Sequence, residues 1–301
     1  MILFILFPGF GQTDKFWKYN IVESKNTKNR YKLKKIDFLK QLKKIGKVYT
    51  YTPKAYDFNY YYTGSTEGLE DWQEIYCNLF KKPKKITLDD INIDKECKRI
   101  YNLLRAKYKN ENIKFIPIGH SLGSWFALHF TNLYPSYCLK LIFLDGSYIV
   151  PEIVNLYYKK RANKINSKEL TNKKLELLFD KIIENIQENK YKVNTKINKY
   201  LDELDDIVFA FYYKIMKKEL NGKAKVPIIS FRNLNFDLEK GKNKKDRNKV
   251  NMHRVKNEEE LYNINNTKIT TYYLINSTHF PWRIQRYSDQ IINEIKQNII
   301  L

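Results

Sequence analysis

The stretch from residue 113 to residue 124 constrains the fold more than any other part of the chain. An apolar run ends in Gly-His-Ser-Leu-Gly at residues 119–123, and a helix-like segment follows at once. A serine flanked in this way by glycines is typical of a very tight turn, because a side chain at either glycine would collide with the strand or the helix. The sequence therefore predicts a strand–turn–helix unit with Ser121 exposed at its tip in a strained backbone conformation.

Similar apolar runs recur along the chain and alternate with amphipathic segments. Strands are predicted at residues 2–7, 48–52, 113–118, 139–145, 226–231 and 268–275, and helices at residues 33–45, 91–108, 122–133 and 283–299. Alternation of this kind predicts an α/β fold with a mostly parallel sheet that helices cover on both faces.

One long segment interrupts the alternation. Residues 151–222 have helical, highly charged patterning and no clear strand. An all-helical insertion between two strands of one sheet indicates a cap, so we expect a core of residues 1–150 and 224–301 and a helical cap at 151–223. Residues 237–260 are dense in Lys, Asn and Glu, which favours a loop.

Residues 54–86 are rich in aromatic side chains and turn-forming residues. Two interpretations stay open for this segment. It is either a long ordered excursion near the functional site or a surface loop whose tyrosines reflect codon usage.

The chain is strongly basic, with a net charge of +22 over 301 residues. Its lysines are scattered, and the abundance of Lys, Asn, Ile and Tyr beside few Gly, Ala and Arg is typical of an AT-rich genome. We therefore expect no specific nucleic-acid partner, only nonspecific binding to polyanions at low salt.

Cys77, Cys97 and Cys138 show no metal-binding or redox spacing, which favours buried, reduced thiols in a cytoplasmic setting. The apolar segment Met1–Phe7 has no basic flank and is too short for a signal peptide or membrane span. No later segment is apolar for long enough to span a bilayer.

A serine hydroxyl becomes a useful nucleophile only with a base within hydrogen-bond reach and an acid that orients the base. The four histidines are His120, His129, His253 and His279. His279 follows the predicted strand at 268–275 on a short loop, and such loops point into the crevice where open α/β sheets bind ligands. We expect His279 to be the base.

Together these motifs resemble the α/β-hydrolase superfamily. The resemblance lies in Gly-His-Ser-Leu-Gly-Ser at 119–124, His-Phe-Pro-Trp at 279–282 and Phe-Pro-Gly-Phe-Gly at 7–11. It covers residues 1–150 and 224–301, whereas the cap carries no recognisable motif. It implies an α/β-hydrolase fold.

The resemblance also implies roles for individual residues. Ser121 would be the nucleophile and His279 the base, in the family's chain order of serine, acid and histidine. The turn at residues 7–11 corresponds to the family's oxyanion loop, with Pro8 in place of the usual histidine. The backbone N–H groups of Phe10 and Leu122 would then form the oxyanion hole.

Two aspartates are candidates for the acid. The family usually places it after the strand that follows the cap, which favours Asp237, one residue beyond the usual spacing and with Asn233 in place of the usual glycine. Some members take the acid from the end of the preceding strand, where this chain has Asp145. Asp145 also fits a structural turn residue. We expect Asp237, with Asp145 as the alternative.

The sequence departs from the family at its start, where the antiparallel strands that usually come before the oxyanion strand are missing. We therefore expect a shorter sheet of six parallel strands. Its long apolar edge would need a cover, either residues 54–86 or a second copy of the chain in a homodimer.

The expected function is that of a serine hydrolase acting on a small carboxylic ester or thioester, without cofactor or metal. A helical cap and nearby aromatic side chains favour an apolar acyl group. Two alternatives remain: an acyltransferase that uses the same three residues, and a catalytically inactive binding protein that keeps the fold.

Overall fold

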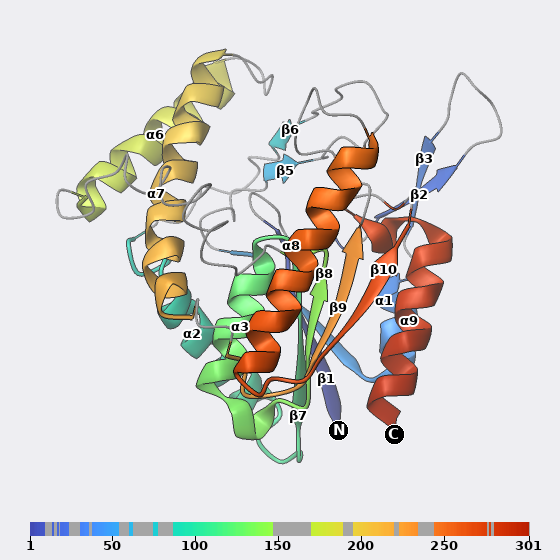
Figure 1. Ribbon diagram of the computed structural model, residues 1–301. Helices are drawn as coiled ribbons and strands as arrows, with labels where there is room; N and C mark the ends of the chain where they lie inside the picture. The colour runs from blue at the N-terminus through green and yellow to red at the C-terminus, as the bar shows by residue number, and fades with distance from the viewer. Residues whose placement is uncertain are drawn as a thin grey trace.

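The predicted strands form one sheet. In the computed structural model, six parallel strands lie in the order β10-β9-β8-β7-β1-β4 (Figure 1). Their bounds are β1 (Ile2–Phe7), β4 (Lys47–Thr50), β7 (Lys114–His120), β8 (Leu141–Leu144), β9 (Ile228–Asn233) and β10 (Ile269–Leu274). The expected sheet of six parallel strands is thus confirmed, and no antiparallel strand joins it within the described residues.

The structure describes residues 1–9, 14, 17, 19–23, 31–35, 38–53, 60–62, 75–77, 87–146, 170–188, 195–219, 223–233, 244–275, 277 and 280–300. Most of the aromatic segment at 54–86 therefore lies outside the described residues.

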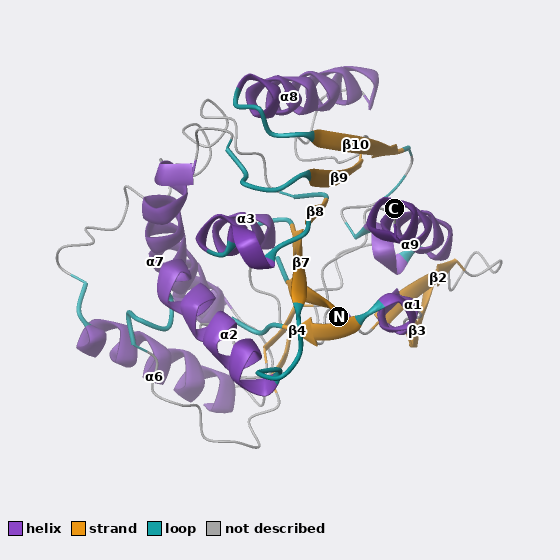
Figure 2. Cartoon of the chain, turned by 90° about the horizontal axis from the view of Figure 1, so that it is seen from below, coloured by secondary structure: helices purple, strands orange, loops and turns teal. Residues whose placement is uncertain are grey.

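Helices cover both faces of the sheet (Figure 2). One face carries α1 (Phe38–Ile45) and α9 (Gln285–Ile300). The other carries α2 (Ile93–Lys107) and α3 (Gly123–Leu133). A short 3-10 turn, η3 (Pro135–Tyr137), follows α3, and another, η5 (Pro281–Arg283), precedes α9.

Strand β1, which lies between β7 and the edge strand β4, shows how the sheet divides the core in two. Leu3, Ile5 and Phe7 pack into the cluster under α2 and α3. Phe4 and Leu6 pack into the cluster under α1 and α9. Successive side chains of a strand point to opposite faces, so a continuous apolar run is what a strand buried on both faces requires.

Two short hairpins stand outside the main sheet. β2 (Tyr19–Glu23) pairs with β3 (Tyr31–Lys35), and β5 (Tyr60–Tyr62) pairs with β6 (Ile75–Cys77). The prediction of one helix over residues 33–45 is therefore wrong at its start. Residues 31–35 belong to a strand, and the helical spacing that seemed to begin at Leu33 joined two separate elements.

The prediction of a loop at 237–260 is also wrong from residue 244 on, because α8 spans Lys244–Ile264, while residues 237–243 lie outside the described residues. Lys and Glu form helices well, and the helix buries only a narrow stripe of side chains. Val255, Glu258 and Tyr262 lie on that stripe at helical spacing, and each is almost fully buried. A helix so polar on its other faces has little periodic signal in the sequence.

Two further helices lie between β8 and β9 in the chain. These are α6 (Asn172–Glu188) and α7 (Thr195–Glu219), which pack against each other while α7 also contacts α2 and α3. Figures 1 and 2 show the pair outside α2 and α3. Their helical character agrees with the predicted insertion, and the division into core and cap stays a prediction.

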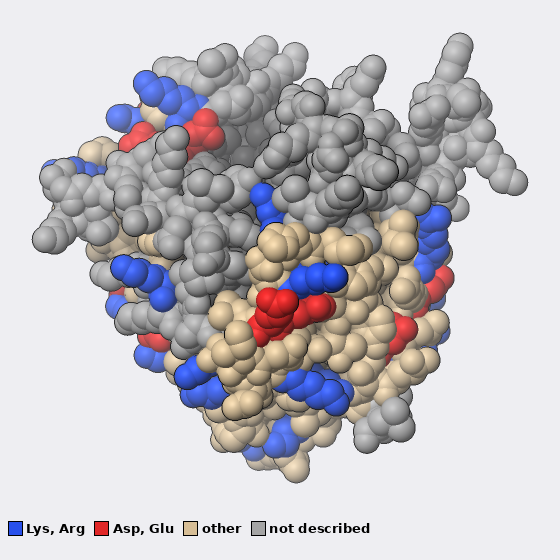
Figure 3. All heavy atoms as spheres, viewed as in Figure 1, with Lys and Arg blue, Asp and Glu red and all other residues tan. Residues whose placement is uncertain are grey.

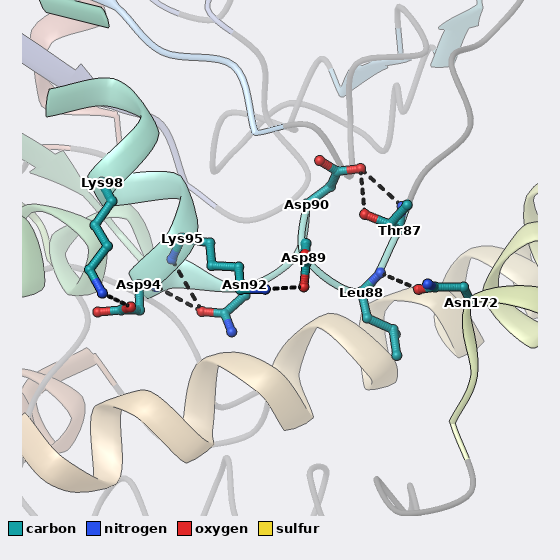
Figure 4. Close-up of polar contacts among 9 residues, drawn as sticks. All are labelled: Thr87, Leu88, Asp89, Asp90, Asn92, Asp94, Lys95, Lys98 and Asn172. Atoms are coloured by element: carbon teal, nitrogen blue, oxygen red, sulfur yellow. Dashed lines mark hydrogen bonds and ion pairs between the residues drawn. The ribbon is translucent and has the colours of Figure 1, made fainter. Parts of the chain in front are cut away.

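The start of α6 is tied to the turn that precedes α2 (Figure 4). The backbone N–H of Leu88 donates to Oδ1 of Asn172 at 2.8 Å. The turn itself is closed by Asp90, whose Oδ2 accepts from the backbone N–H and hydroxyl of Thr87 at 2.9 and 3.0 Å. The start of α6 is thereby held against the segment that leads into α2, one of the helices that cover the sheet.

The N-terminus of α2 carries a polar network that reaches α3. Asn92 caps the helix by accepting from the backbone N–H groups of Asp94 and Lys95. Oδ2 of Asp94 accepts from Lys98 at 2.7 Å, and its Oδ1 lies 3.3 Å from Nε2 of His129. Partial burial alone would raise the pKa of Asp94, but the hydrogen bonds from Lys98 and His129 outweigh it and lower that pKa.

Replacing Asp94 with asparagine is expected to reduce the free energy of unfolding by about 0.5–1 kcal/mol at neutral pH, because an ion pair is lost. A carboxyl whose pKa is lowered on folding stabilises the protein above its ordinary pKa, and this contribution disappears as the pH falls through the lowered value. Urea denaturation at about pH 7 and about pH 3 measures the difference.

Asp89→Asn is the matched control, since Asp89 forms a more exposed ion pair with Lys95. It should change stability little at either pH. An Asp94→Asn effect of equal size at both pH values would contradict the assignment.

Lysines at the base of the sheet, where the strands begin, contact the carboxyl ends of helices. Lys114 donates to the carbonyl of Ser136 at 2.9 Å, Lys225 to that of Asn132 at 3.0 Å, and Lys140 to that of Asn298. Figure 3 shows basic side chains at this lower end of the molecule. The last carbonyls of a helix have no N–H partner within the helix, and these lysines supply the missing hydrogen-bond donors.

Cys97 and Cys138 are buried, as predicted, while the side chain of Cys77 lies outside the description. Burial raises the pKa of Cys138 to about 12, so this thiol stays protonated and unreactive at neutral pH. Within the parts of the chain that the structure describes, no helix is both long enough and apolar enough to cross a membrane.

Candidate active site

The turn at Ser121 has the geometry that its sequence predicts. β7 ends at His120 and α3 begins at Gly123, so only two residues separate strand from helix. Ser121 has a φ of 48°, in the left-handed region that non-glycine residues rarely adopt. Its side chain is partly exposed, whereas that of Leu122 is buried.

The two glycines around this turn are required by close backbone contacts. A Cβ on Gly119 would lie 2.4 Å from Cα of Ser124. A Cβ on Gly123 would lie 2.3 Å from the carbonyl oxygens of both Phe7 and Pro8. The turn is therefore packed directly against the end of β1, where the chain enters the predicted oxyanion loop.

Ser124 fixes the turn from within. Its backbone N–H donates to the carbonyl of Ser121 at 3.0 Å, and its hydroxyl donates to the same carbonyl at 2.6 Å. Gly146 packs against this serine so closely that a Cβ there would lie 2.8 Å from Cβ of Ser124. Ser121 also donates its backbone N–H to the carbonyl of Leu144 at 3.4 Å, which links the turn to the end of β8.

Asp145 occupies a second strained position on the same sheet edge. It directly follows β8, has a φ of 45° and is buried. Its backbone N–H donates to the carbonyl of Phe231 at 2.7 Å, and its Oδ1 accepts from the backbone N–H of Asn233 at 3.1 Å. The structure thus brings Ser121, Leu122 and Asp145 to the carboxyl ends of two neighbouring strands.

A buried ion pair that sequence analysis missed lies beside Asp145. Arg232 of β9 and Glu258 of α8 are each 1% exposed, and Nη2 of the arginine donates to Oε2 of the glutamate. Nη1 of Arg232 donates to the carbonyl of Gly146. The available signal was an arginine directly after the predicted strand at 226–231, because a charge at the end of a buried strand requires a partner.

The three histidines among the described residues, His120, His129 and His253, lie in different parts of the structure. His120 is fully buried in an aromatic cluster, with its ring centroid 4.5 Å from that of Trp282 and 5.3 Å from that of Phe280. His129 of α3 contacts Asp94 of α2, and His253 lies on α8. His120 thus packs beside the turn as part of the aromatic core.

Three predicted site residues, Phe10, Asp237 and His279, lie outside the described residues. The chain directly after His279 is well anchored, because Trp282 is fully buried and packs 4.6 Å from the ring of Trp17. Among the residues that are described, no group of three or more His, Cys, Asp or Glu side chains could hold a metal ion.

The fold has counterparts among solved structures. A highly thermostable carboxyl esterase from Bacillus coagulans, in complex with glycerol, aligns with a TM-score of 0.52 at 13% identity, over 99% of this chain and 88% of that one. DBJA aligns with a TM-score of 0.51 at 9% identity, over 99% and 90% of the two chains. An alpha/beta hydrolase enzyme from the metagenome of lagoon sediments of Mar Chica, Morocco, is 14% identical over 100% and 92%, with a TM-score of 0.45.

No protein-family model matches the sequence, and no curated protein matches it either. The parallel sheet, its strand order and the structural likenesses together show that the chain has the α/β-hydrolase fold. The resemblance found in the sequence is therefore confirmed for the fold.

Proposed function

We propose that the protein is a serine hydrolase that cleaves a small carboxylic ester or thioester through an acyl-enzyme on Ser121. The observation that carries the proposal is the turn at Ser121, where a partly exposed serine has a φ of 48° between a buried strand and a helix. Strain of this kind costs free energy, persists where the surrounding structure holds it in place, and is concentrated at active sites. The printed description of one solved counterpart as a carboxyl esterase supports the same reaction class.

In the proposed reaction, Oγ of Ser121 attacks the acyl carbon while His279 accepts the hydroxyl proton. The tetrahedral intermediate collapses, the bond to the leaving alcohol or thiol breaks, and His279 returns the proton to the leaving group. A water molecule then attacks the acyl-enzyme, again with His279 as base, and releases the carboxylic acid and Ser121.

The negative oxygen of the tetrahedral intermediate would be stabilised by the backbone N–H groups of Phe10 and Leu122. Support for Leu122 comes from its place as the residue before α3, since the first N–H groups of a helix have no acceptor within it. Support for Phe10 comes from the contact of Gly123 with Phe7 and Pro8, which sets the start of the predicted oxyanion loop against the turn.

The acid that orients His279 is proposed to be Asp237, with Asp145 as the alternative. The burial of Asp145 and its place next to the turn favour the alternative. Its hydrogen bond to the backbone of Asn233 equally fits a structural role in joining β8 to β9.

Labelling with a fluorophosphonate tests the proposal, because such a probe reacts covalently only with an activated serine. We expect the folded wild-type protein to be labelled at Ser121, as located by peptide mass spectrometry. Ser121→Ala is expected to abolish labelling with an unchanged circular dichroism spectrum. The exposed-surface variant Leu139→Ala serves as a control that keeps the serine.

Folded wild-type protein that remains unlabelled would overturn the enzyme proposal and favour a binding protein. If labelling occurs, p-nitrophenyl esters of increasing chain length test the proposed apolar acyl group. A flat response near background across that series would contradict simple esterase action.

A further inference from the structure

Among the described residues, the buried arginine of β9 donates to two groups that belong to different parts of the molecule. One arm of the Arg232 guanidinium contacts Glu258 on α8, and the other contacts the carbonyl of Gly146 after β8. Its Cζ also lies 6.0 Å from the ring centre of Phe143 in β8. Planar, two-armed donation of this kind fixes the geometry of both partners at once.

The contact with Gly146 leads directly to the turn at Ser121. Gly146 approaches Ser124 so closely that even a methyl group would not fit between them. A Cβ added at Gly146 would lie 2.8 Å from Cβ and 3.0 Å from Oγ of Ser124. The same Oγ donates to the carbonyl of Ser121 at 2.6 Å. Displacement of Gly146 would therefore press on, or release, the side chain that holds the strained turn.

From this chain of contacts we infer that Arg232, held by Glu258, is a positioning residue for Ser121: it fixes Gly146, and Gly146 fixes the turn that carries the serine. The inference rests on the proposed function, because it assigns a role in presenting Ser121 for reaction. The role assigned to Arg232 is therefore one of positioning, exerted through Gly146 and Ser124.

A role in stability alone is a weaker account of this pair. Burying two charges costs free energy of hydration that their attraction only partly recovers, and apolar replacement of a buried ion pair is often neutral or stabilising. The second arm of the arginine reaches a backbone carbonyl beside the site, and ion pairing by itself does not need that contact.

The double variant Arg232→Met/Glu258→Leu separates the two roles. It removes both charges of the pair together, whereas a single substitution would leave one of them buried without the other, and Gly146 loses its donor. We expect urea denaturation to give a stability near that of the wild type. We expect the rate constant for fluorophosphonate labelling of Ser121 to fall about tenfold or more, since small misplacements of reacting groups have effects of this order. With an ester substrate, kcat should fall while KM stays close to the wild-type value.

Ile295→Ala is the control for general loss of stability, because this fully buried side chain lies in the C-terminal half of α9. It should weaken the fold without slowing the labelling of Ser121 at a temperature where the protein remains folded. If the double variant does not fold, Arg232→Lys carries the test. Its single ammonium nitrogen keeps the charge beside Glu258 but cannot reproduce the two-armed contact, and it should also slow labelling.

A folded double variant, or a folded Arg232→Lys protein, that is labelled at the wild-type rate would overturn the inference while leaving the proposed function intact. Wild-type protein that is not labelled at all would instead refute the proposed function. The two failures are therefore distinguished by the wild-type reaction alone.

Discussion

Gly123→Ala is expected to lower the free energy of unfolding by about 2–4 kcal/mol, in the upper range for single substitutions. The added Cβ would lie 2.3 Å from the carbonyl oxygens of Phe7 and Pro8, which are backbone atoms and cannot rotate away. Either α3 or the end of β1 must move. Urea denaturation monitored by tryptophan fluorescence measures the loss.

The same substitution should also slow the labelling of Ser121, because the displaced segment leads into the proposed oxyanion loop. Gly46→Ala is the matched control. A Cβ there would lie 2.8 Å from the carbonyl of Ile2, at the opposite end of the strand from the site. It should destabilise the protein less and leave labelling unchanged. Equal effects of the two variants on labelling would contradict a specific role for the contact at Gly123.

Asp237→Asn is expected to lower kcat for ester hydrolysis by about three to four orders of magnitude, the size typical for loss of the acid in a serine–histidine–acid triad. Without the carboxylate, His279 has neither its orienting hydrogen bond nor a counter-charge when it accepts the proton. Steady-state kinetics with a p-nitrophenyl ester provide the measurement.

Asp145→Asn is the matched comparison. Asparagine keeps an oxygen that can accept the backbone N–H of Asn233, so the contact between β8 and β9 survives. If Asp145 has only a structural role, the kcat of Asp145→Asn should be close to that of the wild type. A larger loss from Asp145→Asn than from Asp237→Asn would assign the acid to Asp145 instead.

The sequence predicted the sheet well because buried parallel strands leave an unmistakable pattern. Runs such as Ile2–Phe7 and the residues before Ser121 are apolar on both faces, and the observed strands β1 and β7 coincide with them within two residues. The glycines around the serine predicted the tight turn for a steric reason, and the structure has the close contacts that this reason requires.

Polar segments were predicted less well. The helix α8 has almost no periodic apolar signal, since its buried stripe includes the charged side chain of Glu258. Nothing in the local sequence pairs this glutamate with Arg232, because the partner lies 26 residues away and the contact depends on how α8 packs against the sheet. Long-range polar contacts of this kind follow from tertiary packing and have no local pattern.

For the candidate site, sequence alone was enough to select Ser121 and to bring Asp145 into consideration. It favoured Asp237 over Asp145 only by analogy with the family's usual position, because both residues follow strands that are expected to end at the same edge of the sheet. Position along the chain fixes which edge a residue reaches but does not fix which carboxylate faces the histidine.

The lysine at the carboxyl end of α3 has an electrostatic consequence for the opposite end of that helix. Every α-helix has a partial positive charge at its amino end and a partial negative charge at its carboxyl end. Lys225 contacts the carbonyl of Asn132 and so neutralises the negative end of α3. The positive end lies beside Ser121. An anion that formed at Ser121 would be attracted by the amino end of α3, and Lys225 offsets part of the opposing charge at the other end.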